Sequence, residues 1–454
     1  MLDRCVRTRW DGLADDQFSA SGFFHVAQSG GVFWLVDPDG GRFLSKGVNT
    51  VRFDQDEIRG TKRVPYAEAC TRKYGSAAAW RSAAAQRLIG WGFNTLGSWS
   101  DEAVAANAHL AITANLELGW SFVKQANERA GDGPRHEFPD VFDPGFEPYV
   151  KQRARDMCSP RIGDANILGW FIDNELRWGP DWRGPTELLT LFLRLSPRTP
   201  GRVTAIAFLR ERYADFAAFN AAWLTQATTW DAFEALDRIE PVYQRKPPHE
   251  RSAKDETTAN VADPRRASFF ADCDDFLALA AERYFGLTTA AIKAADPHHL
   301  VLGSRFAFPP AVAVIKAAAR HVDVISSNCY SLDPDDVLST YAPTGKPCLI
   351  GEFSFRGADS GLPNTSGGGP IVATQSERAA AFDRYVTKAL RHPHLVGYHW
   401  FEHADQPAEG RFDGEDCNYG TVTIDDNVYE TLTTTMTTVN AQAETIHAIA
   451  EAIA

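Results

Sequence analysis

Short runs of apolar residues alternate with longer amphipathic stretches along most of the chain. A short run that is apolar on both faces predicts a strand inside a parallel sheet, because helices cover both sides of such a sheet. A longer stretch with apolar residues three or four positions apart predicts a helix with one buried face. The predicted strands lie within residues 43–51, 93–99, 109–120, 167–175, 299–306, 322–330, 347–354 and 395–401.

Helical periodicity separates most of these eight runs. Eight strands that alternate with helices favour an α/β fold of the (β/α)8 TIM-barrel type over an open doubly wound sheet. Residues 176–265 are more than one crossover connection requires, so we expect a long insertion after the fourth strand. The predicted helices lie within residues 76–92, 149–158, 204–223, 268–296 and 428–453.

The beginning of the chain shows a different pattern. Residues 23–36, FFHVAQSGGVFWLV, contain two strand-like runs around Gly30-Gly31, which supplies the positive φ angles of a tight turn. We therefore expect a short N-terminal β-hairpin region. The predicted organisation is a single catalytic domain over 1–454, with a β extension at 1–42, the barrel at 43–405 and a C-terminal loop and helix at 406–454.

Composition narrows the classes of protein. With 454 residues, 44% of them hydrophobic and 23% charged, the chain can bury a large core as an ordinary globular protein. Its formal net charge of −13 disfavours nucleic acid or an anionic membrane surface as a partner. The sequence has no apolar run long enough to cross a bilayer. Composition leaves a homo-oligomer open.

The cysteines and the opening residues bear on location. The cysteines are scattered without a C-x-x-C pair, which is typical of reduced thiols rather than of a disulfide framework. The opening MLDRCVRTRWDGLADDQ lacks the apolar run of a secretory signal, so we expect a cytoplasmic protein. The seven cysteines are Cys5, Cys70, Cys158, Cys273, Cys329, Cys348 and Cys417.

Polar residues end the predicted strands, and a barrel of this type carries its active site at the carboxyl ends of the strands. Two of these residues are carboxylates that end buried runs directly, Glu175 after the fourth strand and Glu352 after the seventh. The sequence has neither a Gly-rich phosphate-binding loop nor a G-x-S-x-G serine turn. The strand-end residues are Asn49, Arg52, Ser98, Trp99, Glu117, Trp120, Asn174, Glu175, Arg305, Asn328, Tyr330, Glu352, Trp400 and Glu402.

Paired carboxylates among aromatic and amide side chains match the needs of glycoside hydrolysis. One carboxyl group protonates the leaving oxygen, and the other attacks the anomeric carbon or activates water. The fourth and seventh strand ends would place Glu175 and Glu352 across the mouth of the barrel. Each glutamate alone is equally well interpreted as a salt-bridged residue on a loop, but the two together favour the catalytic interpretation.

These residues resemble a known group of enzymes. Asn174-Glu175 after the fourth strand and Glu352 after the seventh are similar to the catalytic positions of the retaining glycoside hydrolases of clan A. The resemblance implies that Glu175 is the acid/base and that Glu352 is the nucleophile. It also implies that Tyr330 lies beside the nucleophile and that Trp400 lies under the sugar.

Three segments resemble the family 50 β-agarases more narrowly. They are GGVFWLVDPDGGRFLSKGVN, AFLRERYADFAAFNAAW and VGYHWFEHADQP. The crossover helix among them is also similar to that of the family 42 β-galactosidases. Agarases of this kind often carry an additional N-terminal β domain, where this chain has only a short hairpin region. Residues 355–370, FRGADSGLPNTSGGGP, have no assigned counterpart and are either a lid over the site or an ordinary flexible loop.

The segment HWFEH at residues 399–403 matches the H-x-x-E-H zinc motif. Zinc binding requires His399 and His403 on one face of a helix. The segment instead continues a strand-like run, in which four residues span about 13 Å, so the two rings would not reach one ion. We therefore predict no metal and no cofactor, and a metallopeptidase is the distant alternative.

The predicted substrate contacts surround the two glutamates. Trp400 is expected to be a sugar platform, while His399 and Glu402 are expected to bind hydroxyl groups or to support neighbouring side chains. His399 is alternatively a satisfied histidine at the rim. The full set of predicted contacts is Asn49, Trp99, Asn174, Asn328, Tyr330, His399, Trp400, Glu402 and Asp405.

The sequence therefore predicts a retaining, exo-acting β-glycosidase that hydrolyses β-galactoside, agarose-type or related oligosaccharides with two glutamates. Exo action is expected because a cytoplasmic location favours short imported oligosaccharides over insoluble polymer. The alternatives are another clan A specificity, such as a β-glucosidase or β-mannosidase, and a non-catalytic carbohydrate-binding barrel. Turnover of an aryl β-glycoside would exclude the binding protein.

Overall fold

A computed structural model of the chain describes residues 6–15, 18–131, 133–252, 254, 258–259 and 262–452. Its central element is an eight-stranded sheet in the order β8-β7-β6-β5-β4-β13-β10-β9. Every neighbouring pair is parallel, so the carboxyl ends of all the strands lie on one side of the molecule. The strands are β4 (Ser45–Val48), β5 (Thr95–Leu96), β6 (Ala111–Asn115), β7 (Ile167–Phe171), β8 (Leu300–Val301), β9 (Ile325–Asn328), β10 (Cys348–Phe353) and β13 (Leu395–Trp400).

The prediction of a closed (β/α)8 barrel is wrong. β8 and β9 are the two edges of the sheet, and no ladder pairs them in the part of the chain that the structure describes. Isolated backbone hydrogen bonds connect the two edges, from the amides of Asp323 and Val324 to the carbonyl of Val301 and in a single parallel bridge between Phe306 and Ser327. β8 is only two residues long because Gly303 and Arg305, with φ angles of 81° and 42°, leave the extended conformation. The chain therefore does not continue as a strand along β9, and the sheet has no regular ladder at this edge.

The sheet strands are buried on both faces, which explains their continuous apolar pattern. Every residue of β7, β10 and β13 is buried, as expected for strands covered by helices. The register places Trp400 opposite both Val48 of β4 and Phe353 of β10, so the carboxyl ends of these strands are adjacent.

Helices pack against the sheet and form the rest of the core. α13, for example, begins at Thr374, whose hydroxyl oxygen accepts a hydrogen bond from the backbone amide of Glu377. Tyr385 of this helix stacks against Phe353 of β10. The helices outside the insertion are α1 (Pro65–Tyr74), α2 (Ala77–Gly90), α3 (Leu118–Ala130), α4 (Phe146–Cys158), α10 (Pro264–Ala295), α11 (Val312–His321), α12 (Asp335–Tyr341), α13 (Gln375–Leu390), α14 (Glu430–Asn440) and α15 (Ala443–Ala448).

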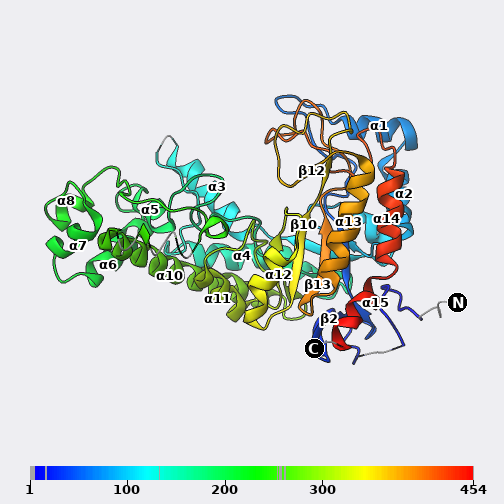
Figure 1. Cartoon of the computed structure of the whole chain (residues 1–454), viewed down its shortest axis with the longest axis horizontal. Coiled ribbons are helices and arrows are strands. Elements are labelled where there is room, and N and C mark those ends of the chain that lie inside the picture. The colour runs from blue at the N-terminus through cyan, green and yellow to red at the C-terminus, as the bar shows by residue number, and fades with distance from the viewer. Residues whose placement is uncertain are drawn as a thin grey trace.

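A long insertion separates β7 from α10 and extends one end of the molecule (Figure 1). It holds α5 (Leu188–Leu193), α6 (Pro200–Arg212), α7 (Phe216–Trp223) and α8 (Trp230–Glu234). α10 runs from these helices back to the sheet, packing against α5 and α7 at one end and against α4 and α11 elsewhere. The predicted division of a single domain at residues 42 and 405 stays a prediction.

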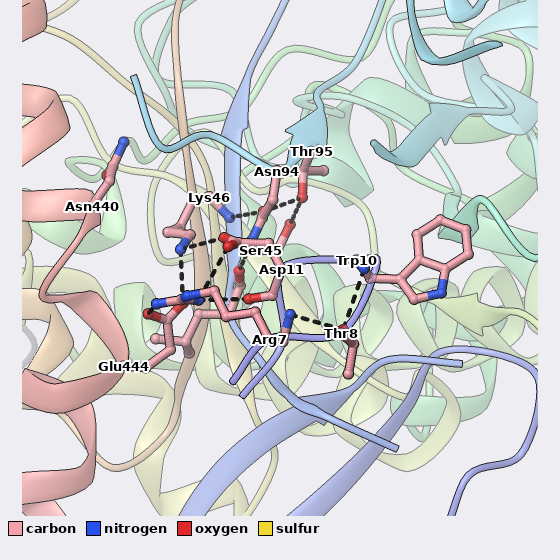
Figure 2. Close-up of polar contacts among 12 residues, drawn as sticks. Arg7, Thr8, Trp10, Asp11, Ser45, Lys46, Asn94, Thr95, Asn440 and Glu444 are labelled. Atoms are coloured by element: carbon pink, nitrogen blue, oxygen red, sulfur yellow. Dashed lines mark hydrogen bonds and ion pairs between the residues drawn. The ribbon is translucent and has the colours of Figure 1, made fainter. Parts of the chain in front are cut away.

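Both ends of the described chain meet at the amino ends of the strands. Beside the predicted hairpin strands β1 (His25–Ser29) and β2 (Val32–Val36), a third strand, β3 (Arg42–Phe43), completes a small antiparallel sheet. Figure 2 shows Lys46 of β4 between Asp11 and Glu444, with Nζ to carboxylate distances of 3.0 and 2.7 Å. Arg7 forms a second ion pair with Glu444. These pairs connect the N-terminal segment, the sheet and α15.

Two further observations concern membrane-spanning helices and the cysteines. Among the described residues no helix is both long enough and apolar enough to cross a membrane. The six cysteines within that part are free and buried, whereas Cys5 lies outside it. The cytoplasmic location stays a prediction.

Candidate active site

The carboxyl ends of the strands surround a cavity of about 920 Å³, which we call the main cavity. Glu175 and Glu352 both line it, although 177 positions separate them in sequence. Their strands, β7 and β10, are not neighbours in the sheet. The common direction of the strands therefore brings together two carboxyl groups from distant parts of the chain.

Glu352 lies within β10 and is 5% exposed. Its Oε1 accepts a hydrogen bond of 2.5 Å from Nη2 of Arg305, and its Oε2 accepts one of 2.7 Å from the hydroxyl group of Tyr330. Arg305 comes from the segment after β8, and Tyr330 comes from the segment after β9. A guanidinium contact favours the charged form of a carboxyl group and so opposes the effect of burial on Glu352.

Glu175 lies just after β7, with a φ angle of 52°. Its Oε1 accepts a hydrogen bond of 2.8 Å from the side-chain amide of Asn328. Its backbone carbonyl accepts a further bond of 3.1 Å from Arg183. The Glu175 carboxyl group has no ion-pair partner within the described residues, so it lacks the direct cation contact that Glu352 has.

The environments give the two carboxyl groups different proton affinities. Burial, followed by the charge of Glu352, raises the pKa of Glu175 to about 7. Burial also raises the pKa of Glu352 above its usual value, but Arg305 and Tyr330 oppose this effect. The contacts therefore favour the proton on Glu175 over Glu352, a difference that would suit a proton donor beside a nucleophile.

Asp173 fixes the segment that carries Glu175. Its carboxylate accepts hydrogen bonds from the backbone amides of Gly119 and Trp120, at 2.7 and 2.9 Å, and from the hydroxyl group of Tyr284 at 2.6 Å. Burial raises the pKa of Asp173 to about 7. Asp173 thus connects the end of β7 to the start of α3, and it is not among the site residues predicted from the sequence.

Four of the predicted substrate contacts lie beside the two glutamates. Trp99, Asn174 and Tyr330 line the main cavity. Asn328 is buried, and its side-chain amide donates to both Asn174 and Glu175. The Oδ1 atom of Asn328 has no hydrogen-bond partner in the described part of the chain. Their roles toward a sugar stay predictions.

The other predicted contacts lie behind the cavity wall. The side-chain amide of Asn49 donates hydrogen bonds to the backbone carbonyls of Gly351 and Trp400. It accepts one from the backbone amide of Ser98. Asp405 accepts hydrogen bonds from Asn418, Gly420 and Tyr429. A sugar contact by either side chain finds no support in this placement, because each is buried and already hydrogen-bonded.

Trp400 does not offer a face to the main cavity. The side chain is 0% exposed, donates from Nε1 to the carbonyl of Tyr419, and packs against Phe353 and Phe382. The structure therefore does not support the predicted stacking of Trp400 on a sugar. The next residue, Phe401, lines the cavity instead.

Glu402 is buried next to a group of charged side chains that were not among the predicted strand-end residues. Its Oε1 accepts a hydrogen bond of 2.9 Å from Gln406 and lies 3.7 Å from Nη1 of Arg411. Burial and the charge of Asp56 raise the pKa of Glu402 well above its usual value. Asp56, Arg411 and Glu415 line the cavity and come from loops, and no strand-end pattern marks them in the sequence.

The loop at 355–370 forms one wall of the main cavity through Ser366, Gly367, Gly368 and Gly369. The short strands β11 (Arg356–Gly357) and β12 (Ile371–Val372) pair at its base. Tyr419 donates to the carbonyl of Gly368 at 2.7 Å, and the Asp416 carboxylate accepts the amide of Ser366. The loop is thus held in place by the segment after β13.

The H-x-x-E-H segment begins inside β13 rather than on a helix. His399 lies with Nε2 2.8 Å from the hydroxyl oxygen of Ser45, whereas His403 packs edge-on against Trp80 and Tyr66. Within the described residues, no group of three or more His, Cys, Asp or Glu side chains is arranged to hold a metal ion. That the activity needs no metal stays a prediction.

Comparison with curated sequences finds relatives among the agarases, although no family model matches the chain. Beta-agarase B of Vibrio sp. (strain JT0107) is 28% identical over 495 residues, which cover 93% of this chain and 48% of that protein. Beta-agarase A of the same organism is 33% identical over 390 residues, covering 81% of this chain and 36% of that protein. The chain thus spans about half or less of the length of these relatives.

Comparison with solved structures also finds similarity to agarases. PfGH50B superposes with a TM-score of 0.77 at 25% identity, over 97% of this chain and 69% of that chain. The agarase AgWH50C gives 0.74 at 25% identity, over 97% and 68%. An exo-beta-agarase gives 0.77 at 23% identity, over 98% and 68%, which shows a shared fold. These matches support the resemblance to family 50, whereas clan A and family 42 stay predictions.

Proposed function

We propose that this chain is a glycoside hydrolase that acts on agarose or related β-galactoside oligosaccharides through Glu175 and Glu352. The observation that carries the proposal is the pair itself, two carboxyl groups in one cavity with different partners. Glu352 contacts a cation and a phenol, while Glu175 contacts an amide. The agarase relatives supply the substrate class.

In the first step a Glu352 carboxylate oxygen attacks the anomeric carbon of the sugar. The glycosidic bond breaks, and Glu175 transfers its proton to the leaving oxygen, so that no alkoxide is released. Arg305 and Tyr330 hold Glu352 by both oxygens, which fixes its position for attack. The products are a glycosyl ester on Glu352 and a free leaving group.

In the second step Glu175, now ionised, removes a proton from water as the water oxygen attacks the anomeric carbon. The ester bond to Glu352 breaks, Glu352 leaves as a carboxylate, and Glu175 is protonated again. Two displacements at one carbon give a product with retained configuration. The mechanism requires the carboxyl groups to be about 5–5.5 Å apart, whereas inversion would need about 6.5–9.5 Å.

Exo action and the exact sugar are the finer parts of the proposal. Exo action rests on the predicted cytoplasmic location and agrees with short oligosaccharides as substrates. Another specificity, such as β-glucosidase or β-mannosidase, is the alternative enzyme, and a non-catalytic carbohydrate-binding protein is the alternative of another class. The paired carboxyl groups with split proton affinities favour an enzyme over the binding protein.

The deciding experiment is a panel of aryl β-glycosides together with agarose oligosaccharides. Proton NMR of the first product should show the retained anomer, and product sizes should show release from one chain end. An inverted first product would refute the two-step mechanism. Binding without turnover of any substrate would favour the carbohydrate-binding alternative.

A further inference from the structure

The exposed tryptophan and phenylalanine side chains of the described part gather at one place. They are Trp182, Phe308 and Phe412, which are 57%, 38% and 72% exposed, and all three line the main cavity. Apolar surface in water is unfavourable by about 25 cal/mol per Å², so grouped exposed rings mark a binding surface. Large aromatic side chains elsewhere in the described structure are buried or half-buried.

Trp182 and Phe308 form a row with another aromatic side chain, that of His249. The Phe308 and Trp182 rings meet edge-on, with centroids 6.0 Å apart, and Phe308 stacks on His249 at 4.3 Å with an interplanar angle of 17°. We call Trp182, Phe308 and His249 the aromatic strip. Its members follow β7, follow β8 and belong to the insertion, respectively.

The aromatic strip leads from the main cavity into a second cavity of about 800 Å³. Phe308 lines both cavities, and His249 lines the second. Ser331 and Asp336 contribute polar groups to the second cavity. Rings that offer flat apolar faces, together with hydroxyl and carboxylate groups, suit a sugar, whose ring has apolar C–H faces and a polar edge.

Trp182 of the strip is connected to the segment that carries Glu175. Trp182 lies in a tight turn in which Asp181 and Gly184 exchange backbone hydrogen bonds. The guanidinium group of Arg183 lies 4.3 Å from the Trp182 ring centroid and donates to the carbonyl of Glu175. Because Glu175 is the proposed acid, a sugar residue bound at the strip would lie on the leaving-group side of the scissile bond.

We propose that the aromatic strip is a leaving-group subsite, which binds sugar residues beyond the oxygen that Glu175 protonates. The proposal rests on the proposed function. It adds that the enzyme prefers substrates whose leaving group is an oligosaccharide over substrates whose leaving group is a short aryl group. The second cavity, similar in size to the main one, gives such a chain room to continue. Phe412 follows β13 and makes no ring contact with the strip within the described part of the chain.

The test compares two substrates that share one glycone, an agarose tetrasaccharide and the aryl glycoside of its non-reducing half. The ratio of kcat/KM for the tetrasaccharide to that for the aryl glycoside should fall roughly tenfold or more in Trp182→Ala and Phe308→Ala. The matched control is Phe412→Ala, another exposed ring of the same cavity, which should keep the wild-type ratio. Thermal unfolding checks that each variant folds.

Calorimetry on the Glu175→Gln background provides a second readout. Adding Trp182→Ala should weaken binding of the tetrasaccharide roughly tenfold. An unchanged ratio with unchanged affinity, or an equal fall in all three ring variants, would overturn the strip proposal while the proposed function stands. If the wild-type protein hydrolyses no glycoside at all, the proposed function fails, and the leaving-group role fails with it.

Discussion

Glu352 accepts hydrogen bonds from Arg305 and Tyr330, whereas the Glu175 carboxyl group accepts one from the neutral amide of Asn328. A guanidinium contact stabilises a carboxylate, and an amide does so far less. Two side chains of identical chemistry therefore acquire different proton affinities from their neighbours. The split is what a double displacement requires, since one carboxyl group must be charged while the other holds a proton.

Conversion of either glutamate to glutamine should remove most of the activity. Glu175→Gln and Glu352→Gln are each expected to lower kcat on an oligosaccharide about a thousandfold or more, because each blocks one half of the mechanism. Asp54→Asn, the same change on an exposed carboxylate of the same cavity, is the control and should have a much smaller effect. Wild-type turnover in either glutamine variant would refute the assignment.

Azide separates the two roles. In Glu175→Ala, azide should replace the water that Glu175 activates, restore turnover of an aryl glycoside, and give a product of retained configuration. In Glu352→Ala, no retained azide product should form, because the glycosyl ester cannot. Retained product from Glu352→Ala alone would exchange the two assignments.

The pH dependence follows from the same contacts. Glu175 must be protonated to act as the acid, and its pKa is raised to about 7, so kcat/KM should fall as the pH rises through about 7. The charge of Glu352 is the second cause of that rise, so Glu352→Gln should lower the pKa of Glu175. Carbon-13 NMR of labelled carboxyl groups, with Glu352→Gln/Glu175→Gln to assign the signal, measures the change. A Glu175 pKa that stays at about 7 would contradict the electrostatic explanation.

At the residue level, the sequence predicted the positions of the two glutamates better than the positions of the side chains around them. A polar side chain that ends an apolar strand must emerge near the carboxyl end of a parallel sheet, so Glu175 and Glu352 were predictable. Trp400 was not, because a shift of one residue along a strand decides whether a ring faces the cavity or the core. Here Phe401 faces the cavity and Trp400 the core.

Among the elements, the loop of residues 355–370 shows how a wall of the cavity is held in place. Gly367 approaches the segment after β13 more closely than a residue with a Cβ atom could. Glycine-rich composition alone predicted either a lid or a flexible loop. The contacts that decide its position involve Asp416 and Tyr419, which are distant in sequence, so the pattern of the loop could not reveal them.

Two glycines of this loop provide a matched test. A Cβ atom at Gly367 would lie 2.7 Å from both Cys417 Sγ and Tyr419 Oη, whereas at Gly361 it would meet nothing within 4 Å. Both have positive φ angles, 109° and 83°, so both alanine variants should lose roughly 1 kcal/mol from backbone strain. Only Gly367→Ala should also displace the wall and lower kcat/KM about tenfold. Equal kinetic effects in Gly361→Ala would refute this role of the wall.

The sheet itself illustrates the limit of counting strands. Eight apolar runs predicted eight strands, and the central sheet of the described residues has eight parallel strands. Closure depends on strand length and register, and β5 and β8 each pair over only two residues. The apolar run at 299–306 continues past β8, but Gly303 and Arg305 turn the chain away within it. The hydrophobic pattern indicates which residues are buried but not how the strands are hydrogen-bonded, so it could not distinguish an open sheet from a closed barrel.

Over the whole molecule, the two ends of the described chain support the sheet from the side opposite the cavity. Lys46 and Glu444 are almost completely buried, and 398 positions separate them in sequence. Nothing in the local pattern of either residue predicts this pair. Burial favours neutral groups, but the mutual attraction prevails, so the pKa of Lys46 is raised and that of Glu444 is lowered. The network is therefore charged in the folded protein.

We expect this network to stabilise the folded protein. Lys46→Met should lower the free energy of unfolding by roughly 3–5 kcal/mol, because it leaves Glu444 buried without its nearest cation. Lys388→Met is the matched control, since Lys388 also contacts two carboxylates, Asp333 and Asp335, but on the exposed surface. It should change stability far less. Urea unfolding at neutral pH measures both, and equal losses would contradict a role for burial.

The pH dependence of that loss tests its electrostatic origin. A lowered pKa means that ionised Glu444 stabilises the fold above the usual pKa of a glutamate, near 4.5, and that this contribution is lost as the pH falls through the folded value. The difference between wild type and Lys46→Met should therefore be largest at neutral pH and shrink below about pH 4. Lys46→Met/Glu444→Leu should recover part of the loss, because an apolar pair needs no cation. A difference that stays constant from pH 7 to pH 3 would show that Lys46 acts by packing alone.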